Sequence, residues 1–372
     1  NAGPGRAVNF KKFPSSLVDK VVIYKSQQAD LVEGGTSGTI DVNSLRAADY
    51  GKSETMVEAT GIYNTYYDDH SANPWGNKFV FSTVQSWETD NLGDMGFSFG
   101  VSHSNSANPE ENYGGSSQMG VCATKFADGS AIDQGSDCVK SEGGISAGRV
   151  GKAPRTDDEG FDLNLWDQDS IYYVPNDAYW RTGEDEDNRT NVVATFQWIF
   201  NDQWDLNLDW ESSKLEYTEQ RMEFSLDSRR RNLANHIIQD RTLLYVEGEA
   251  KPYLQGENRN QVDDYTGYGF NLAYTPNDNL TLALDLSYSE SYRYRLRHRT
   301  KFKAENTETY SLDFRGRNVP ELIFLDGFDP SDMNSFIRND QGWTDAEYRR
   351  SNDERKDDIW AARFDIEYVL GN

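Results

Sequence analysis

The chain has 372 residues, a formal net charge of −25 and a polar mean hydropathy of −0.80. This acidic balance argues against binding to nucleic acid, because a phosphate backbone needs a basic protein surface. The sequence holds no run of about 18 apolar residues, which excludes a helical membrane span. It does not exclude a transmembrane β-barrel, since the strands of a barrel face lipid only at every second residue.

The first fifty residues contain two short predicted strands separated by a glycine-rich link. An apolar strand ends at Tyr24 and Lys25, and a second strand begins at Thr39. Glycines that follow a strand can cradle a phosphate group, but such a loop opens a helix, whereas a strand follows here. We therefore do not expect this link to bind a nucleotide. Its characteristic residues are Glu33, Gly34, Gly35 and Gly38.

The segment 13–44 resembles the C-terminal part of the plug domain of TonB-dependent outer-membrane receptors. In that family a strand ending in Tyr-Lys leads to Glu-Gly-Gly, a further Gly and a closing strand. Within the family it is most similar to proteobacterial receptors often associated with glycan uptake. The resemblance implies a 22-stranded barrel whose interior is filled by a plug. The matching positions are Val21, Ile23, Tyr24, Lys25, Ala29, Glu33, Gly34, Gly35, Gly38, Thr39, Ile40 and Val42.

From residue 51 onward, apolar and polar side chains alternate in runs of strand length. In the segment 191–210, Phe196 and Trp198 share one face of a strand, and Trp204 and Leu208 share one face of the next. Runs of about 9–11 residues have the length of a strand that crosses a bilayer at a tilt of about 45°. We predict eight such strands. Similar alternation occurs at 95–102, 267–288 and 360–368.

The predicted connections alternate between short turns and long links. The short turns are 89–93, 201–203 and 275–279, and aromatic residues such as Trp87 and Tyr274 lie near them. Outer-membrane barrels have short periplasmic turns, longer extracellular loops and aromatic girdles. The sequence therefore predicts an all-β fold, an antiparallel transmembrane β-barrel in the outer membrane of a Gram-negative bacterium. The long extracellular loops are expected at 105–189, 218–263 and 299–357.

The two parts together predict a receptor fragment. Residues 1–50 are expected to be the C-terminal part of a plug domain, and residues 51–372 the N-terminal part of the barrel. A closed barrel of eight strands has an interior just wide enough for side chains, so it has no room for a plug. We therefore expect about eight of 22 strands in this chain. The segment that contacts TonB in the family is absent from this sequence.

Two sets of residues are candidates for binding a substrate. The strand parity places Arg293, Arg295, Arg297 and Arg299 on the inner face, above the membrane. Their guanidinium groups could bind an anionic substrate bidentately, or could form a structural ladder with carboxylates of neighbouring strands. Aromatic residues of the longest loop could stack on sugar rings, or could form the core of that loop. These aromatic residues are Trp166, Tyr172, Tyr173 and Trp180.

Other motifs indicate neither catalysis nor metal binding. Residues 96–100 fit the pattern GxSxG, but Ser98 lies in the middle of a predicted strand, whereas hydrolases place this serine on a sharp turn. Cys122 and Cys138 in the longest loop are expected to form a disulfide, because an extracellular loop is oxidising. A zinc site there lacks partners, since His103 is the only nearby histidine. We therefore expect no catalytic residue, no metal and no cofactor.

The expected function is uptake of a scarce solute, either an oligosaccharide or a siderophore-like compound, with energy delivered by TonB. Its partners would be outer-membrane lipid, TonB and a small-molecule or oligosaccharide ligand. One alternative is a small outer-membrane barrel with a structural or adhesive role. Another is a soluble β-rich carbohydrate-binding protein or hydrolase.

Overall fold

The computed structural model describes residues 18–26, 39–65, 73–115, 119–131, 167–175, 177–336 and 346–369, and these residues form an all-β protein with one short helix. Two single 3-10 turns lie at Gln168–Ser170 and Met333–Phe336. Among the described residues, no helix is long and apolar enough to cross a membrane. The elements are β1 (Val18–Tyr24), β2 (Thr39–Ser44), α1 (Ala47–Tyr50), β3 (Glu54–Tyr63), β4 (Trp75–Thr89), β5 (Gly93–Gly115), β6 (Met119–Ala123), β7 (Ile171–Pro175), β8 (Ala178–Asn201), β9 (Trp204–Gln239), β10 (Thr242–Asn277), β11 (Leu280–Lys303), β12 (Glu308–Asp313), β13 (Glu321–Phe324) and β14 (Ala346–Tyr368).

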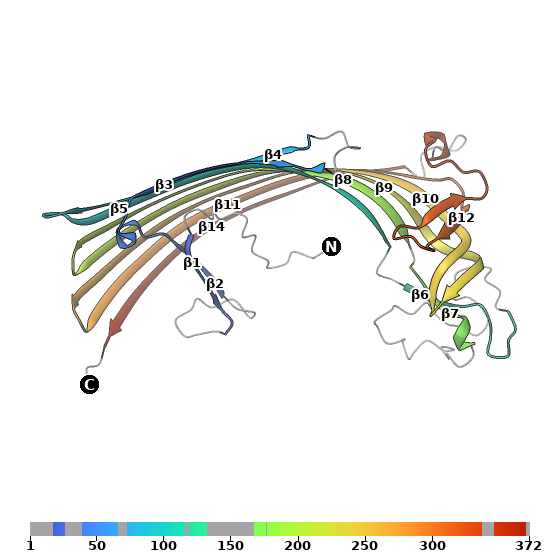
Figure 1. Cartoon of the computed structure of the whole chain (residues 1–372), viewed down its shortest axis with the longest axis horizontal. Helices are drawn as coiled ribbons and strands as arrows, with labels where there is room; N and C mark the ends of the chain where they lie inside the picture. Colours follow the sequence, from blue (N-terminus) through green and yellow to red (C-terminus); the bar gives the residue numbers. More distant parts are fainter. Residues whose placement is uncertain are drawn as a thin grey trace.

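Eight long strands form one arched antiparallel sheet, which we call the main sheet (Figure 1). Their order is β3, β4, β5, β8, β9, β10, β11 and β14, so each strand pairs with its neighbour in chain order. The eight predicted strands are therefore present. The sheet is not closed, because in the described part of the chain β3 pairs only with β4, and β14 only with β11.

The two faces of the main sheet differ in polarity, as the alternation predicts. Along one hydrogen-bonded row, Phe97, Phe196, Leu208, Phe270 and Leu286 lie side by side on the convex face. Side chains alternate between the two faces of a strand, so the intervening residues point the other way. The adjacent row on the concave face holds Ser98, Thr195, Asp209, Gly269 and Ser287.

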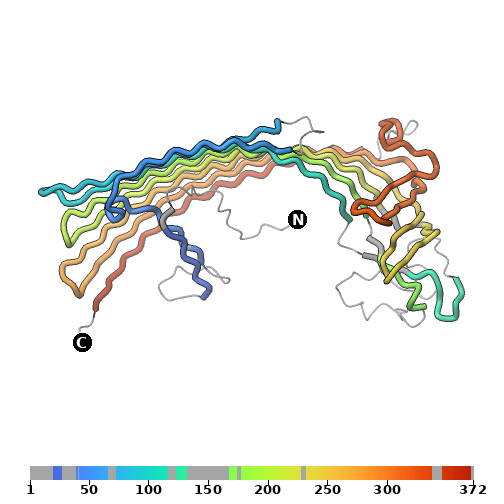
Figure 2. Tube along the Cα trace, viewed as in Figure 1, coloured from blue at the N-terminus to red at the C-terminus, as the bar shows by residue number. Residues whose placement is uncertain are grey.

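The strands are joined by tight turns at one end of the sheet, which we call the short-turn end. The turns at 90–92, 202–203 and 278–279 agree with the predicted ones. The tube trace in Figure 2 shows these turns gathered at the end opposite to the smaller strands β12 and β13. We call that opposite end the far end.

The long links differ from the expected loops, because much of them is strand. Nearly all of 218–263 belongs to β9 and β10, which have 36 residues each. These two strands meet in a tight turn at Asp240 and Arg241, both with positive φ, the backbone of a type I′ hairpin turn. β5 and β8 likewise extend into 105–189, and β11 and β14 extend into 299–357. The side chains of these extensions are polar on both faces, so the apolar alternation of a membrane strand is missing there. Pairs of opposite charges on neighbouring strands can still stabilise the sheet.

A small hydrophobic core lies at the far end. It brings β7, β12 and β13 against the ends of β9 and β10. Tyr172, Leu226, Val246, Tyr310 and Leu312 are fully buried in it. The far ends of β9 and β10 are therefore packed against β7, β12 and β13, which stabilises them beyond the pairing of the two strands alone.

Candidate functional site

The concave face near the far end carries a network of arginines and carboxylates. The four arginines predicted from the sequence occupy successive concave-face positions on β11. Each of them has a carboxylate partner on β10 or β14. The carboxylates lie on neighbouring strands because the register places them there: Asp263 is opposite Arg293, and Asp353 is opposite Arg295. The ion pairs are Arg293–Asp263 at 2.6 Å, Arg295–Asp353 at 3.0 Å, Arg297–Glu257 at 2.5 Å and Arg299–Glu347 at 2.9 Å.

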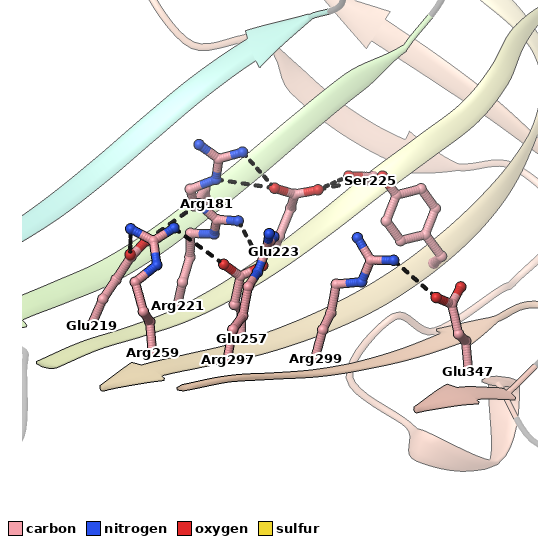
Figure 3. A network of polar contacts seen from close by, with 11 residues as sticks. Arg181, Glu219, Arg221, Glu223, Ser225, Glu257, Arg259, Arg297, Arg299 and Glu347 are labelled. Carbon is pink, nitrogen blue, oxygen red and sulfur yellow. Dashed lines mark hydrogen bonds and ion pairs between the residues drawn. The ribbon is translucent and has the colours of Figure 1, made fainter. Parts of the chain in front are cut away.

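Glu257 is the centre of this network (Figure 3). Its side chain is 0% exposed, and it pairs with Arg297, with Arg221 at 3.1 Å and with Arg259 at 3.6 Å. Burial alone would raise the pKa of Glu257, but the hydrogen bond from Arg297 and the attraction of Arg221 and Arg259 lower it overall. The carboxylate is therefore held ionised by three guanidinium groups.

The network continues across β9 to β8. Arg259 pairs with Glu219 at 2.7 Å, and Arg181 donates two hydrogen bonds to Glu223 at 2.7 and 3.0 Å. Ser225 also donates to Glu223. These residues are not predicted from the sequence, because loops are expected at 105–189 and 218–263. The signal that could have found them is the continued alternation of charges at Glu219, Arg221 and Glu223.

The predicted aromatic residues do not gather at this network. Tyr172 is fully buried, and its hydroxyl hydrogen-bonds to His236 at 2.8 Å. The backbone N–H of Tyr173 donates to the carbonyl oxygen of Arg241. Trp166 lies outside the described residues.

Trp180 lies instead beside a cavity of about 510 Å³ at the far end. The Trp180 ring is 5.3 Å from the Tyr113 ring and 6.0 Å from the Phe224 ring, measured between centroids. Two residues of the network, Arg181 and Glu223, also border this cavity. Its apolar lining consists of Tyr113, Trp180, Met222, Phe224, Leu254 and Val319.

A second polar contact region lies on the concave face nearer the short-turn end, where the segment 44–50 docks. Arg46 pairs with Asp209 at 3.2 Å. The amide oxygen of Gln197 accepts hydrogen bonds from the backbone N–H groups of Ala48 and Asp49. At Gly96 a Cβ atom would overlap the backbone of α1, so glycine permits the close approach. Figure 1 shows β1, β2 and α1 on the concave side of the sheet.

The remaining sequence candidates have simple placements. Tyr24 and Thr39 pair directly between β1 and β2, and Lys25 follows β1. Ser98 is fully buried in β5 and hydrogen-bonds to Thr195. Cys122 lies on β6. The link residues Glu33, Gly34, Gly35 and Gly38, and the expected disulfide partner Cys138, lie outside the described residues.

Within the described ranges, no three or more His, Cys, Asp or Glu side chains are grouped in a way that could hold a metal ion. Comparison of the chain with protein-family models, with curated proteins and with solved structures finds no match. The class that the structure defines is thus an open antiparallel β-sheet protein with an apolar convex face and a charged concave face.

Proposed function

We propose that this chain forms part of the wall and plug of a TonB-dependent outer-membrane receptor, which imports a scarce solute such as an oligosaccharide or a siderophore-like compound. The proposal rests on the sequence resemblance of segment 13–44 and on the two faces of the main sheet. The convex face would contact lipid, and the concave face would line the interior, where β1, β2 and α1 lie.

The observation that carries the membrane proposal is an apolar band that runs obliquely across the convex face. The row that contains Trp360 on β14 reaches Thr55 on β3 at its other end. On β14 the band stops at Trp360, because the next convex residue is Asp358, whereas on β3 and β4 it continues to Tyr63 and Trp75. In the next convex row toward the far end, the side chains pass from apolar to polar across the sheet. Phe81, Val101 and Val192 are followed by Ser212, Thr266, Glu290 and Asp358.

The slope of this band matches the strand tilt of a membrane barrel. At β14 the band ends at Trp360, in the row that contains Thr55, whereas on β3 it ends at Tyr63. The limit of the band therefore shifts by eight residues across the eight strands of the sheet. With about 3.3 Å per residue and about 4.8 Å per strand, the slope is about 40°. Strands of outer-membrane barrels tilt by about 35–45°. A flat bilayer crossing tilted strands would require such an oblique band.

Exposure argues against the water-soluble alternative. Trp360 is 79% exposed and Ile366 is 66% exposed, and both lie on the apolar convex face. Contiguous apolar patches of this kind are rare on soluble monomers, but they are required on a surface that meets lipid. The unpaired edges of β3 and β14 argue against a complete eight-stranded barrel and favour pairing with further strands.

The function can be tested in the cells that produce the protein. We expect the protein in the outer-membrane fraction, and we expect deletion of its gene to abolish growth on one scarce solute as the sole source of carbon or iron. Loss of TonB should abolish the same growth, because the transport needs energy from the inner membrane. Recovery of the protein in a soluble fraction, or growth that is independent of TonB, would contradict the proposal.

A further inference from the structure

Basic side chains continue along β11 beyond the four arginines, although the whole chain carries a net charge of −25. Six successive concave-face positions on β11 are basic. Two of them face further arginines directly across the strand pair: Arg293 is opposite Arg355, and Arg299 is opposite Arg349. Like charges directly opposite each other destabilise a sheet unless an anion lies between them. The six positions on β11 are Arg293, Arg295, Arg297, Arg299, Lys301 and Lys303.

Basic side chains of β11 and β14 come together around Glu347. This carboxylate pairs with Arg299 at 2.9 Å and with Arg349 at 3.4 Å, and Lys301 lies directly opposite it in the register. Glu347 therefore has three cationic neighbours, of which Arg299 also lies directly opposite Glu257 on β10. Lys303, by contrast, has its own partner, Asp227, at 3.4 Å.

Lys301 lies over an aromatic ring, with its Nζ atom 3.4 Å from the centroid of Tyr253. This contact positions the ammonium group but does not neutralise it. Burial lowers the pKa of Lys301, and the neighbouring Lys303 lowers it further. Arg349 lies on the edge strand β14, and its side chain is 65% exposed, so a solute can reach it.

We infer that Arg299, Lys301 and Arg349 form a subsite for a carboxylate group of an anionic solute. The inference rests on the proposed function, because only in a receptor does the concave face line a route for substrate. A carboxylate is favoured because Glu347 already supplies one to Arg299, so the guanidinium groups are arranged for that geometry. An incoming carboxylate would bind Arg349 and Lys301 and would reduce the repulsion between Arg299 and Arg349.

The test measures binding of two hexasaccharides to the 372-residue chain folded in detergent micelles, by isothermal titration calorimetry. Hexagalacturonate carries a carboxylate on each sugar, whereas maltohexaose is neutral. We expect hexagalacturonate to bind at least about tenfold more tightly than maltohexaose, and this preference to fall with added salt. Equal binding, or no detectable binding of hexagalacturonate, would overturn the inference.

Substitutions locate the site. We expect Lys301→Gln with Arg349→Gln to weaken hexagalacturonate binding about tenfold, and Glu347→Gln to strengthen it, because a competing carboxylate is removed. If the double variant fails to fold, Lys301→Gln and Glu347→Gln are tested singly with the same expected directions. Lys356→Gln is the matched control, since Lys356 lies on the convex face of the same strand and pairs with Glu290. An equal loss in this control would overturn the inference.

The same preparation separates the two proposals. If the chain folds only in detergent and shows no preference for the charged sugar, the subsite is wrong and the receptor proposal stands. If the chain remains monodisperse without detergent and still prefers hexagalacturonate, the subsite stands and the receptor proposal is wrong.

Discussion

Arg46 and Asp209 form an ion pair that joins the N-terminal segment to the concave face of β9, 163 residues further along the chain. Ser44 donates a hydrogen bond to the same carboxylate at 2.9 Å. Asp209 therefore binds one side chain from the end of β2 and one from the segment that follows it. This contact and the bonds of Gln197 fix the position of α1.

Loss of the Arg46–Asp209 pair should loosen the docked segment without unfolding the main sheet. Both side chains are about one-third exposed, so we expect Asp209→Asn to cost about 1 kcal/mol locally. Hydrogen exchange measured by mass spectrometry should show faster exchange in 44–50 and little change in β9. Lys52→Ala is a suitable control, since Lys52 forms an exposed pair with Glu54. Unchanged exchange in 44–50 of the Asp209→Asn protein would show that this ion pair does not hold the segment.

Gly96 should be essential for the same docking. A valine at this position would overlap the backbone of Ala48 and Ala47, which cannot move aside as a flexible side chain could. We expect Gly96→Val to displace α1 and to make the segment 39–50 sensitive to protease. Gly61→Val is the matched control, because no atom lies within 4 Å of a Cβ at Gly61. Equal protease sensitivity of the two variants would contradict the expected role of Gly96.

Tryptophan fluorescence can locate the apolar band. In vesicles that contain brominated lipids, bromine atoms quench tryptophans that contact the acyl chains. We expect Trp360→Phe to remove a quenched component, because Trp360 is highly exposed on the convex face. Trp180→Phe should remove an unquenched component, since Trp180 packs beside Phe224 at the far end. The membrane assignment of the band would fail if Trp360 were not quenched.

Glu257→Gln should destabilise the sheet by about 2 kcal/mol. Breaking a buried ion pair typically costs about 3–5 kcal/mol, and the partly exposed arginine Arg297 reduces this value. The measurement is the denaturant midpoint of the protein folded in detergent. Glu216→Gln, which alters an exposed pair with Lys214, should change the midpoint little.

The effect of Glu257 should also depend on pH. Its pKa is lower in the folded protein than the ordinary value of 4.5, so its stabilising contribution is fully present above that value and is lost as the pH falls through the folded pKa. The difference in unfolding free energy between the wild type and Glu257→Gln should therefore be largest near neutral pH and should shrink in acid. A difference that grows in acid would contradict the lowered pKa.

Much of the main sheet could be predicted from the sequence. Alternation such as that from Leu280 to Tyr288 specifies both a strand and its apolar face, because side chains in a strand point in turn to opposite sides. Turn residues such as Asn201 and Asn277 marked where strands end. The arginines of β11 were placed correctly on one face because the parity of an apolar strand continues into its polar extension.

The rest depended on contacts between distant segments. The carboxylate partner of Arg299 is Glu347, which the register of β11 with β14 brings opposite Lys301, and no local pattern reports that register. The docking of Arg46 on Asp209 likewise joins segments with no shared local signal. The extended lengths of β9 and β10 were missed because their polar halves lack the apolar alternation by which strands are recognised.

The tight turn at Asp240 and Arg241 has a consequence for the order of assembly. It joins two strands of 36 residues, so their pairing can start from residues adjacent in sequence and close stepwise from the turn. Hairpin formation of this kind takes about 1–10 μs, far less than contacts between distant segments require. We therefore expect the β9–β10 hairpin to act as the folding nucleus, onto which β8 and β11 then add on either side.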